Sequence, residues 1–294
     1  FGDNMRNVGV TEGDKVEAQI QFGWTVDYFG IGDLVQVIDR VSDEEVEQLF
    51  EEYKELYTFD YGDYEEKTWE EHVKVQAQQE IGIRRFLEEG GYNAFTTNFE
   101  DLYGMKQLPG LAVQRLMAEG YGFAGEGDWK TAAIDRLLKI MARGKDTGFM
   151  EDYTYELASG QEAILESHMM EVDPTLAATK PRIVVSPLSM GDREDPARLV
   201  FDGKAGEGVV VSMADFGTHY KLLINEVEAF EPTTEAPNLP VARVLWKTKP
   251  NFHEGVHSWI QAGGGHHTVV SLNLTTDQIE TWAKLVELET VVIR

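Results

Sequence analysis

The pattern of helical and strand signals changes near residue 145, and this change constrains the fold more than any other feature of the sequence. Before it, amphipathic helical stretches alternate with short apolar runs, as in an α/β layer structure. After it, short apolar stretches separated by turn residues predict an antiparallel sheet or barrel. A chain of 294 residues is long enough for two domains of ordinary size. We therefore predict an α/β domain over residues 1–145 and a β-rich domain over residues 146–294.

Helix signals in the first part are strong. Ser42 and Glu45 form a capping box, and the apolar positions that follow recur on one helical face. A second long helix is expected from about residue 68 to the glycines at 90 and 91, which favour a helix end. Further elements are expected as helices near 15–20, 109–120 and 128–142 and as strands at 24–29, 93–98 and 121–124.

The second part is read mainly as strands. They are expected at residues 149–157, 163–172, 182–187, 197–201, 209–214 and 220–230. Two helical stretches, 254–262 and 276–286, flank an apolar run at 268–272.

The charge balance argues against two classes of partner. Acidic residues number 52 against 26 basic ones, and the resulting net charge of −26 repels phosphate backbones and anionic lipid heads. We interpret most of this charge as solvated helix faces. No stretch approaches the roughly 20 apolar residues of a membrane helix. We expect a soluble protein with no nucleic acid and no membrane as partner, and the absence of cysteine fits a cytoplasmic location.

Without cysteine, a metal site must use histidine, aspartate or glutamate. Glu126, between two glycines after an expected strand, is either a site residue or a first-turn acid favoured by the helix dipole. Glu151 is either a ligand or an exposed acid at a strand end, and His168 is either a ligand or a hydrogen-bonded core histidine. His266 and His267 follow three glycines, a flexible run that allows two imidazoles to approach a ligand closely.

These carboxylates and imidazoles would form an oxygen and nitrogen site if they converge. Such a site suits Mn²⁺, Co²⁺ or Mg²⁺ better than thiolate-binding ions. No HExxH spacing supports zinc, and no complete glycine-rich phosphate motif is present, so a nucleotide enzyme is disfavoured. The other histidines are interpreted as surface residues: His72, His219, His253 and His257.

Several longer strings, taken together, closely resemble the L-arabinose isomerase family. They are FEDL at 99–102, KQLPGLAVQR at 106–115, GFAGEGDWKTA at 122–132, FMEDYTY at 149–155 and AGGGHHTV at 262–269. The resemblance extends over the whole chain and implies a Rossmann-like parallel-sheet domain followed by an antiparallel β-barrel domain. Family members usually carry a further N-terminal α/β domain, so the chain is expected to be a short form or a fragment of such a protein.

The resemblance also assigns roles to individual residues. It implies that Glu126, Glu151, His168 and His267 hold Mn²⁺, with Co²⁺ or Mg²⁺ as other ions. It implies that a second set lines the sugar site, namely Met5, Phe99, Tyr153, Met190 and His266. As in the family, a homo-oligomer, either a trimer or a hexamer, is expected.

The implied reaction is the interconversion of an aldose and a ketose. It moves a proton between adjacent carbons through an enediol, and we assign the acid and base work to Glu126 and Glu151. The expected substrate is L-arabinose, giving L-ribulose, with slower conversion of D-galactose to D-tagatose. Two alternatives stay open at this point, a non-catalytic metal-binding or sugar-binding fragment and an isomerase for another sugar.

Overall fold

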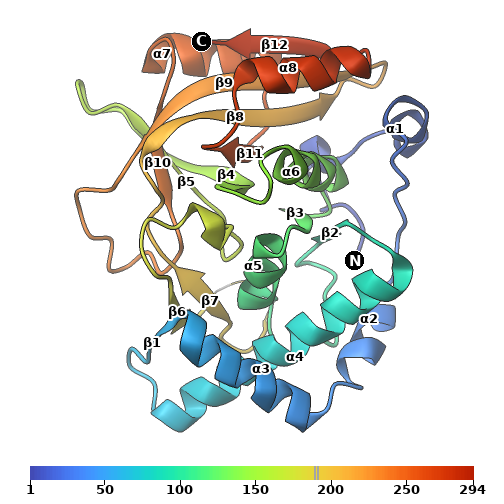
Figure 1. Cartoon of the computed structure of the whole chain (residues 1–294), viewed down its shortest axis with the longest axis vertical. Coiled ribbons are helices and arrows are strands. Elements are labelled where there is room, and N and C mark those ends of the chain that lie inside the picture. Colours follow the sequence, from blue (N-terminus) through green and yellow to red (C-terminus); the bar gives the residue numbers. More distant parts are fainter. Residues whose placement is uncertain (189, 191) are drawn as a thin grey trace.

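The structure, a computed structural model, describes residues 1–188, 190 and 192–294, with Tyr153 described by its backbone alone. A β-barrel occupies one end of the molecule, and helices α2 to α5 gather at the other (Figure 1). The helices are α1 (Lys15–Phe22), α2 (Ile31–Ile38), α3 (Asp43–Leu56), α4 (Glu66–Gly90), α5 (Gly110–Ala118), α6 (Trp129–Met141), α7 (Phe252–Ala262) and α8 (Thr276–Leu285), with 3₁₀ turns η1 (Gly9–Thr11) and η2 (Pro174–Leu176).

Helix α3 forms for the reasons that its sequence suggests. The Ser42 side chain accepts a hydrogen bond from the Glu45 backbone N–H, and the Glu45 carboxylate accepts one from the Ser42 backbone N–H, so the capping box is present. The apolar face of α3 is buried against α4, where Phe50 and Tyr53 share a core with Trp69. Each fully buried side chain of this kind contributes roughly 1.5–3 kcal/mol. The α3–α4 pair thus forms a stable base for the α/β part.

The parallel sheet of the α/β part is small. Strand β2 (Ala94–Thr97) pairs in parallel with β3 (Gly122–Gly125), and α6 packs on both. A second sheet joins β1 (Thr58–Asp60), β6 (Arg182–Val185) and β7 (Ala197–Val200), with β1 parallel to β6. This second sheet draws strands from both sides of residue 145, and the division into two domains there stays a prediction.

The predicted barrel is confirmed. Its six antiparallel strands run in the order β4, β5, β10, β9, β8 and β11, and β11 returns to β4 to close the barrel. Their bounds are β4 (Thr147–Glu156), β5 (Ala163–Ser167), β8 (Gly206–Asp215), β9 (Tyr220–Phe230), β10 (Val244–Thr248) and β11 (His267–Ser271). A last strand, β12 (Glu289–Ile293), adds to β9 in parallel outside the closed ring.

The two faces of the barrel wall have different neighbours. Val211 and Val269 pack with Leu138 of α6, and that face is therefore the outside of the barrel. Side chains alternate along a strand, so Met150 and Trp246 point the other way, into a different core. Residues of β4 and β11 that share the face of Val269 therefore face the α/β part.

The strand expected at residues 24–29 is wrong. This segment forms no strand, because its aromatic side chains pack into two separate clusters. Trp24 stacks on Trp282 of α8 with ring centroids 6.4 Å apart, whereas Phe29 meets Phe86 of α4 edge to face at 5.0 Å. The segment is a bridge between the barrel side and α4.

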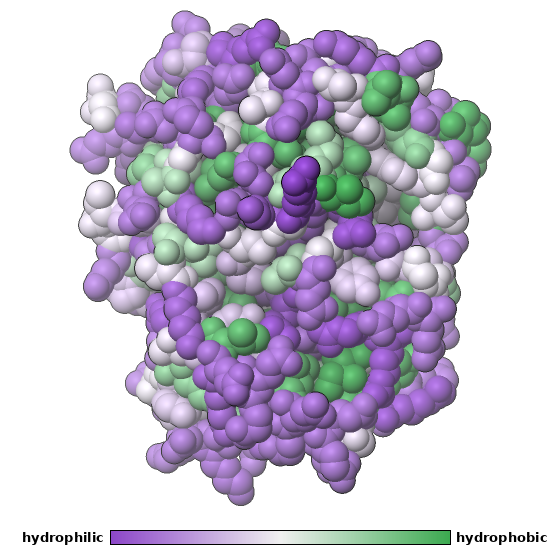
Figure 2. Space-filling view, in the orientation of Figure 1, coloured by the Kyte–Doolittle hydropathy of each residue, from purple (hydrophilic) through white to green (hydrophobic). Residues whose placement is uncertain are grey.

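The surface matches the acidic composition. Figure 2 shows hydrophilic side chains over most of the visible face, with smaller apolar areas between them. Within the part of the chain that the structure describes, no helix combines the length and the apolar character required to cross a membrane.

Candidate metal centre

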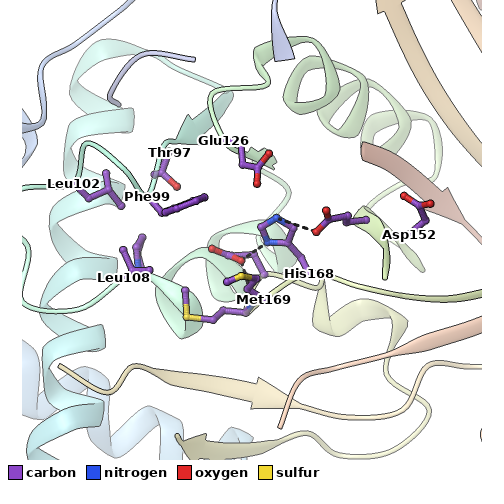
Figure 3. A pocket seen from close by; sticks show the side chains of 12 residues that line it. Thr97, Phe99, Leu102, Leu108, Glu126, Asp152, His168 and Met169 are labelled. Carbon is purple, nitrogen blue, oxygen red and sulfur yellow. Dashed lines mark hydrogen bonds and ion pairs between the residues drawn. The ribbon is translucent and has the colours of Figure 1, made fainter. Parts of the chain in front are cut away.

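The four residues expected to hold metal come from four different elements. Glu126 follows β3, Glu151 lies in β4, His168 follows the end of β5, and His267 begins β11. Glu151 is directly opposite His267 on the neighbouring strand and opposite Ser167 on the other side. The barrel wall therefore brings three of the four together, and the β3–α6 loop adds Glu126 from the α/β part. Figure 3 shows Glu126 and His168 on facing sides of this space.

Glu126, His168 and His267 converge most closely. Each offers one ligand atom, and these three atoms all lie within 4.8 Å of one another. Nε2 of His267 is 3.5 Å from Oε2 of Glu126. Glu151 borders the same space, since its Oε2 is 3.9 Å from Nε2 of His168. This spacing leaves room for one ion between the side chains.

Each buried histidine is oriented by a carboxylate on its far side. Nδ1 of His168 donates to Oε2 of Glu171 at 2.5 Å, and Nδ1 of His267 donates to Oδ2 of Asp128 at 3.0 Å. With Nδ1 carrying the proton, Nε2 of each ring has its lone pair free for a ligand. Asp128 and Glu171 were not among the residues expected to support the site.

The Nε2 atoms of His168 and His267 are buried and have no hydrogen-bond partner. Buried polar atoms in folded proteins nearly always have a partner, so two such atoms facing one carboxylate are well placed to bind a cation. One carboxylate and two imidazoles, with a second carboxylate beside them, are donors suited to a divalent cation of intermediate softness. The residues present therefore fit the metal that the family resemblance implies.

The backbone around Glu126 is strained in a specific way. Glu126 has φ 62°, in the left-handed region that side chains with a β-carbon rarely adopt. At Gly125, a β-carbon would lie 2.8 Å from the His168 ring. At Gly127, which has φ 81°, a β-carbon would lie 2.6 Å from Cα of Asn4. The two glycines thus admit two different neighbours, and the turn directs the Glu126 side chain into the site.

The electrostatics of the cluster favour a cation. Burial alone would lower the pKa of His168, but the carboxylates of Glu171, Glu151 and Glu126 raise it to about 9. The pKa of Glu126 is lowered chiefly by His266, whose Nε2 lies 3.8 Å away, too far for a direct hydrogen bond. Surplus negative charge at this site is balanced either by a proton on an imidazole or by a bound cation.

Asp128 is ionised within the same cluster. Burial alone would raise the pKa of Asp128, but Lys130, His267 and Thr131 lower it to about 2. Oδ2 of Asp128 is the oxygen that faces His267, and Oδ1 lies 3.2 Å from the buried ammonium group of Lys130. Asp128 therefore serves His267 as a fixed negative partner.

A cleft of about 250 Å³ opens beside the side chains expected to hold metal. Glu126, Glu151 and His168 line it together with largely apolar residues, among them Phe99, Leu102, Leu108, Met169 and Met170. Figure 3 shows Phe99, Leu102 and Leu108 on the side of the cleft away from Asp152. A pocket of this kind, with polar groups gathered at one end, suits a small ligand that is held there by its oxygen atoms.

The residues expected to contact sugar are distributed unevenly around this cleft. Phe99 lines it, and Nε2 of His266 lies between Glu126 and Glu151, 3.8 Å and 3.9 Å from their carboxylates. Met5 donates its backbone N–H to the Glu126 carbonyl at 2.9 Å. Met190 is half-buried and is not among the cleft-lining residues. The side chain of Tyr153 lies outside the described residues.

The fold and the site define a class of protein, in which a closed barrel is set against an α/β layer with a carboxylate and imidazole centre between them. The family model described as the L-arabinose isomerase central domain matches residues 1–144. The model described as the L-arabinose isomerase C-terminal domain matches residues 146–289. The chain belongs to the L-arabinose isomerase family.

Individual relatives agree with the family models. L-arabinose isomerase 2 of Bacillus licheniformis is 78% identical over 294 residues, covering 100% of this chain and 62% of the relative. L-arabinose isomerase of Oceanobacillus iheyensis is 76% identical over 294 residues, with 100% and 62% covered. That of Geobacillus stearothermophilus is 58% identical over 293 residues, with 100% and 59% covered. The chain therefore spans 59–62% of the length of these curated relatives.

Proposed function

We propose that this chain carries the metal site and the proton-transfer groups of an aldose–ketose isomerase acting on L-arabinose to give L-ribulose. One observation carries the proposal. Two buried imidazole Nε2 atoms without partners face Glu126 beside a second carboxylate, in a chain of the L-arabinose isomerase family.

We assign the metal to Glu126, Glu151, His168 and His267, with Mn²⁺ as the preferred ion and Co²⁺ or Mg²⁺ as substitutes. A bound ion of this kind supplies Lewis-acid stabilisation for negative charge that develops on substrate oxygens. Glu171 and Asp128 support the proposal because they fix the tautomer of both histidines.

The two glutamates are the proton-transfer groups in this proposal. One carboxylate removes the proton from C2 of the aldose while O1 gains a proton, which leaves an enediol. Return of a proton to C1, with loss of the O2 proton, completes the ketose, so no atom is gained or lost. The pKa of Glu126 is lowered, chiefly by His266, so its carboxylate is ionised at neutral pH and able to accept a proton.

The cleft is the sugar site in this proposal. Phe99 and His266 flank it, and Met5, Tyr153 and Met190 are assigned to it by the family resemblance. L-arabinose is the expected substrate, and slower conversion of D-galactose to D-tagatose is a secondary expectation. A cytoplasmic homo-oligomer, as a trimer or a hexamer, completes the proposal, and a mass measurement in solution tests the oligomer.

A second function is kept because the chain spans at most 62% of the length of the relatives reported above. The alternative is a fragment that binds metal and sugar but does not turn sugar over. Binding of ribitol, a linear polyol, in the presence of Mn²⁺ without ketose formation would favour it. Turnover of another aldose, with none of L-arabinose, would indicate an isomerase for a different sugar.

The test of the proposed function is ketose formation from L-arabinose by EDTA-treated protein with and without added Mn²⁺. We expect activity only with metal, and a fall of about 10²–10⁴-fold in both Glu126→Gln and Glu151→Gln, since each removes a proton-transfer group. Glu89→Gln, an exposed change at the end of α4, is the matched control and should keep full activity. Retained activity in both active-site variants would reject the assignment.

A further inference from the structure

The strained turn at Glu126 needs contacts that hold it in place. A non-glycine residue at φ 62° returns to a more common backbone conformation unless its surroundings oppose the change. Backbone bonds supply part of this restraint. The Glu126 carbonyl accepts from Met5 N at 2.9 Å, and Gly127 N donates to the Thr97 carbonyl at 3.3 Å.

A side chain from a distant segment completes the restraint. The Asn4 amide nitrogen donates to the Gly127 carbonyl at 3.1 Å and to the Thr11 carbonyl at 2.6 Å. One amide group therefore ties the turn at residues 125–128, here called the metal loop, to both ends of the segment 4–11. The residue after Glu126 is thereby fixed by a bond that its own loop cannot provide.

The segment 4–11 and the metal loop are in close van der Waals contact. A β-carbon at Gly127 would lie 2.6 Å from Cα of Asn4 and 2.8 Å from the Asp3 carbonyl, so only glycine allows the approach. Further along the segment, the Val10 carbonyl accepts from Nζ of Lys130 at 2.9 Å. The segment thus follows the loop from Gly127 to the first turn of α6.

We propose that Asn4 is a positioning residue for the Glu126 carboxylate. It acts through the Gly127 carbonyl, holds the left-handed turn at Glu126, and touches neither the metal nor the sugar. The inference rests on the proposed metal site. Figure 3 shows what the turn achieves, since Glu126 points from its loop toward His168 across the cleft.

Asn4→Asp is the most informative variant, because it keeps the shape of the side chain and removes the amide donor. Both carbonyls would then face a carboxylate oxygen, and both bonds would be lost. The added negative charge beside a cation site would by itself strengthen metal binding. A fall in affinity therefore reports displacement of Glu126 and not electrostatics. Asn4→Ser removes the same bonds without a charge and serves if Asn4→Asp does not fold.

Asn273→Asp is the matched control. The Asn273 amide donates to the Ala142 carbonyl at 3.0 Å, so the same type of bond is lost at a place outside the metal site. We expect a lower melting temperature for this variant and an unchanged dissociation constant for Mn²⁺. Any general loosening of the fold would appear in this variant as well.

The experiment measures Mn²⁺ binding by titration calorimetry, the visible absorption spectrum with Co²⁺, and the melting temperature in EDTA. For Asn4→Asp and Asn4→Ser we expect a Kd for Mn²⁺ about tenfold higher and a changed Co²⁺ spectrum, a tenfold change being about 1.4 kcal/mol. Unchanged affinity in folded Asn4 variants, or an equal loss in Asn273→Asp, would overturn the role of Asn4. No Mn²⁺ binding by the unaltered chain would instead overturn the metal site itself.

Discussion

The variant Gly125→Ala tests whether the His168 ring needs the space left by the absence of a side chain at residue 125. A β-carbon at residue 125 would lie 2.8 Å from Cε1 and 2.9 Å from Nε2 of His168. Ordinary contact begins at 3.4 Å, so the ring would have to move by about 0.6 Å, the difference between 2.8 Å and 3.4 Å. The ring has little freedom, because Nδ1 is hydrogen-bonded to Glu171 at 2.5 Å and the ring packs on Phe149 with centroids 4.9 Å apart and the planes tilted by 57°.

A displacement of this size matters for metal binding. Metal–ligand distances hold to within about 0.2 Å. We therefore expect Gly125→Ala to weaken Mn²⁺ binding by about 10–100-fold, as loss of a supporting contact does at other metal sites. Crowding in a packed interior should also lower the free energy of unfolding by about 1–3 kcal/mol. Titration calorimetry with Mn²⁺ and urea unfolding in EDTA measure the two effects separately.

Gly32→Ala is the control for this change. Gly32 lies inside α2, and a β-carbon there would meet no atom within 4 Å. Alanine should stabilise the helix by up to about 1 kcal/mol and leave Mn²⁺ binding unchanged. If Gly125→Ala binds Mn²⁺ as tightly as the unaltered chain, the His168 ring does not depend on the space that Gly125 leaves.

Three further predictions concern charge and metal. Asp128→Asn leaves the buried Lys130 without its charged partner and His267 without its carboxylate. We therefore expect the free energy of unfolding, measured in urea, to fall by about 3–5 kcal/mol and Mn²⁺ binding to weaken. An unchanged free energy of unfolding would contradict this. Burial raises the pKa of Asp135 to about 7 despite the nearby Lys139, while Asp173 reinforces the shift. In the unfolded chain the pKa of this carboxyl is about 4, so between pH 4 and 7 only the folded chain keeps the proton. The free energy of unfolding should therefore fall as pH rises from 4 to 7, by up to about 4 kcal/mol. Asp135→Asn should flatten that pH dependence, and an unchanged profile would show that another group is responsible. Finally, Mn²⁺ at 100 times its Kd should add about 2.7 kcal/mol of stability that EDTA removes; equal melting temperatures with and without Mn²⁺ would argue against a native-state site.

Local sequence signals predicted the elements that depend on local chemistry. The Ser42 and Glu45 capping box starts α3 as expected, and Gly91 ends α4 in the left-handed conformation that its sequence favours. The short apolar stretches separated by turn residues after residue 145 predicted an antiparallel sheet or barrel, and the structure has a closed antiparallel barrel there. In each case the residues that determine the element lie close together in the sequence, so a short stretch of sequence is enough to predict the element.

Tertiary pairing decided what the sequence left open. Thr58 pairs with Arg182, and such a distant partner is invisible to local pattern. The strand expected at 163–172 ends at Ser167, because the chain turns there and Ser167 bonds to the His168 and Ala242 carbonyls. That turn places His168 beside the cleft.

The supporting carboxylates were missed for a related reason. Asp128 reads as an ordinary helix cap, and its Oδ1 does accept from Thr131 N at 3.2 Å. Its second role, toward His267, depends on a contact with a residue 139 positions away. Glu171 lies only three residues after His168, and this short spacing was the signal available in the sequence. A search for carboxylates near each candidate histidine would have found Glu171 but not Asp128.

Anomalous X-ray scattering at the manganese edge, from crystals of this chain soaked in Mn²⁺, would locate the metal directly. We expect a peak bounded by Glu126, His168 and His267, in contact with Nε2 of both rings and with Glu151 at its border. The same peak should be absent after soaking in EDTA. Anomalous density elsewhere, with Nε2 of both histidines still free of metal, would contradict the proposed centre.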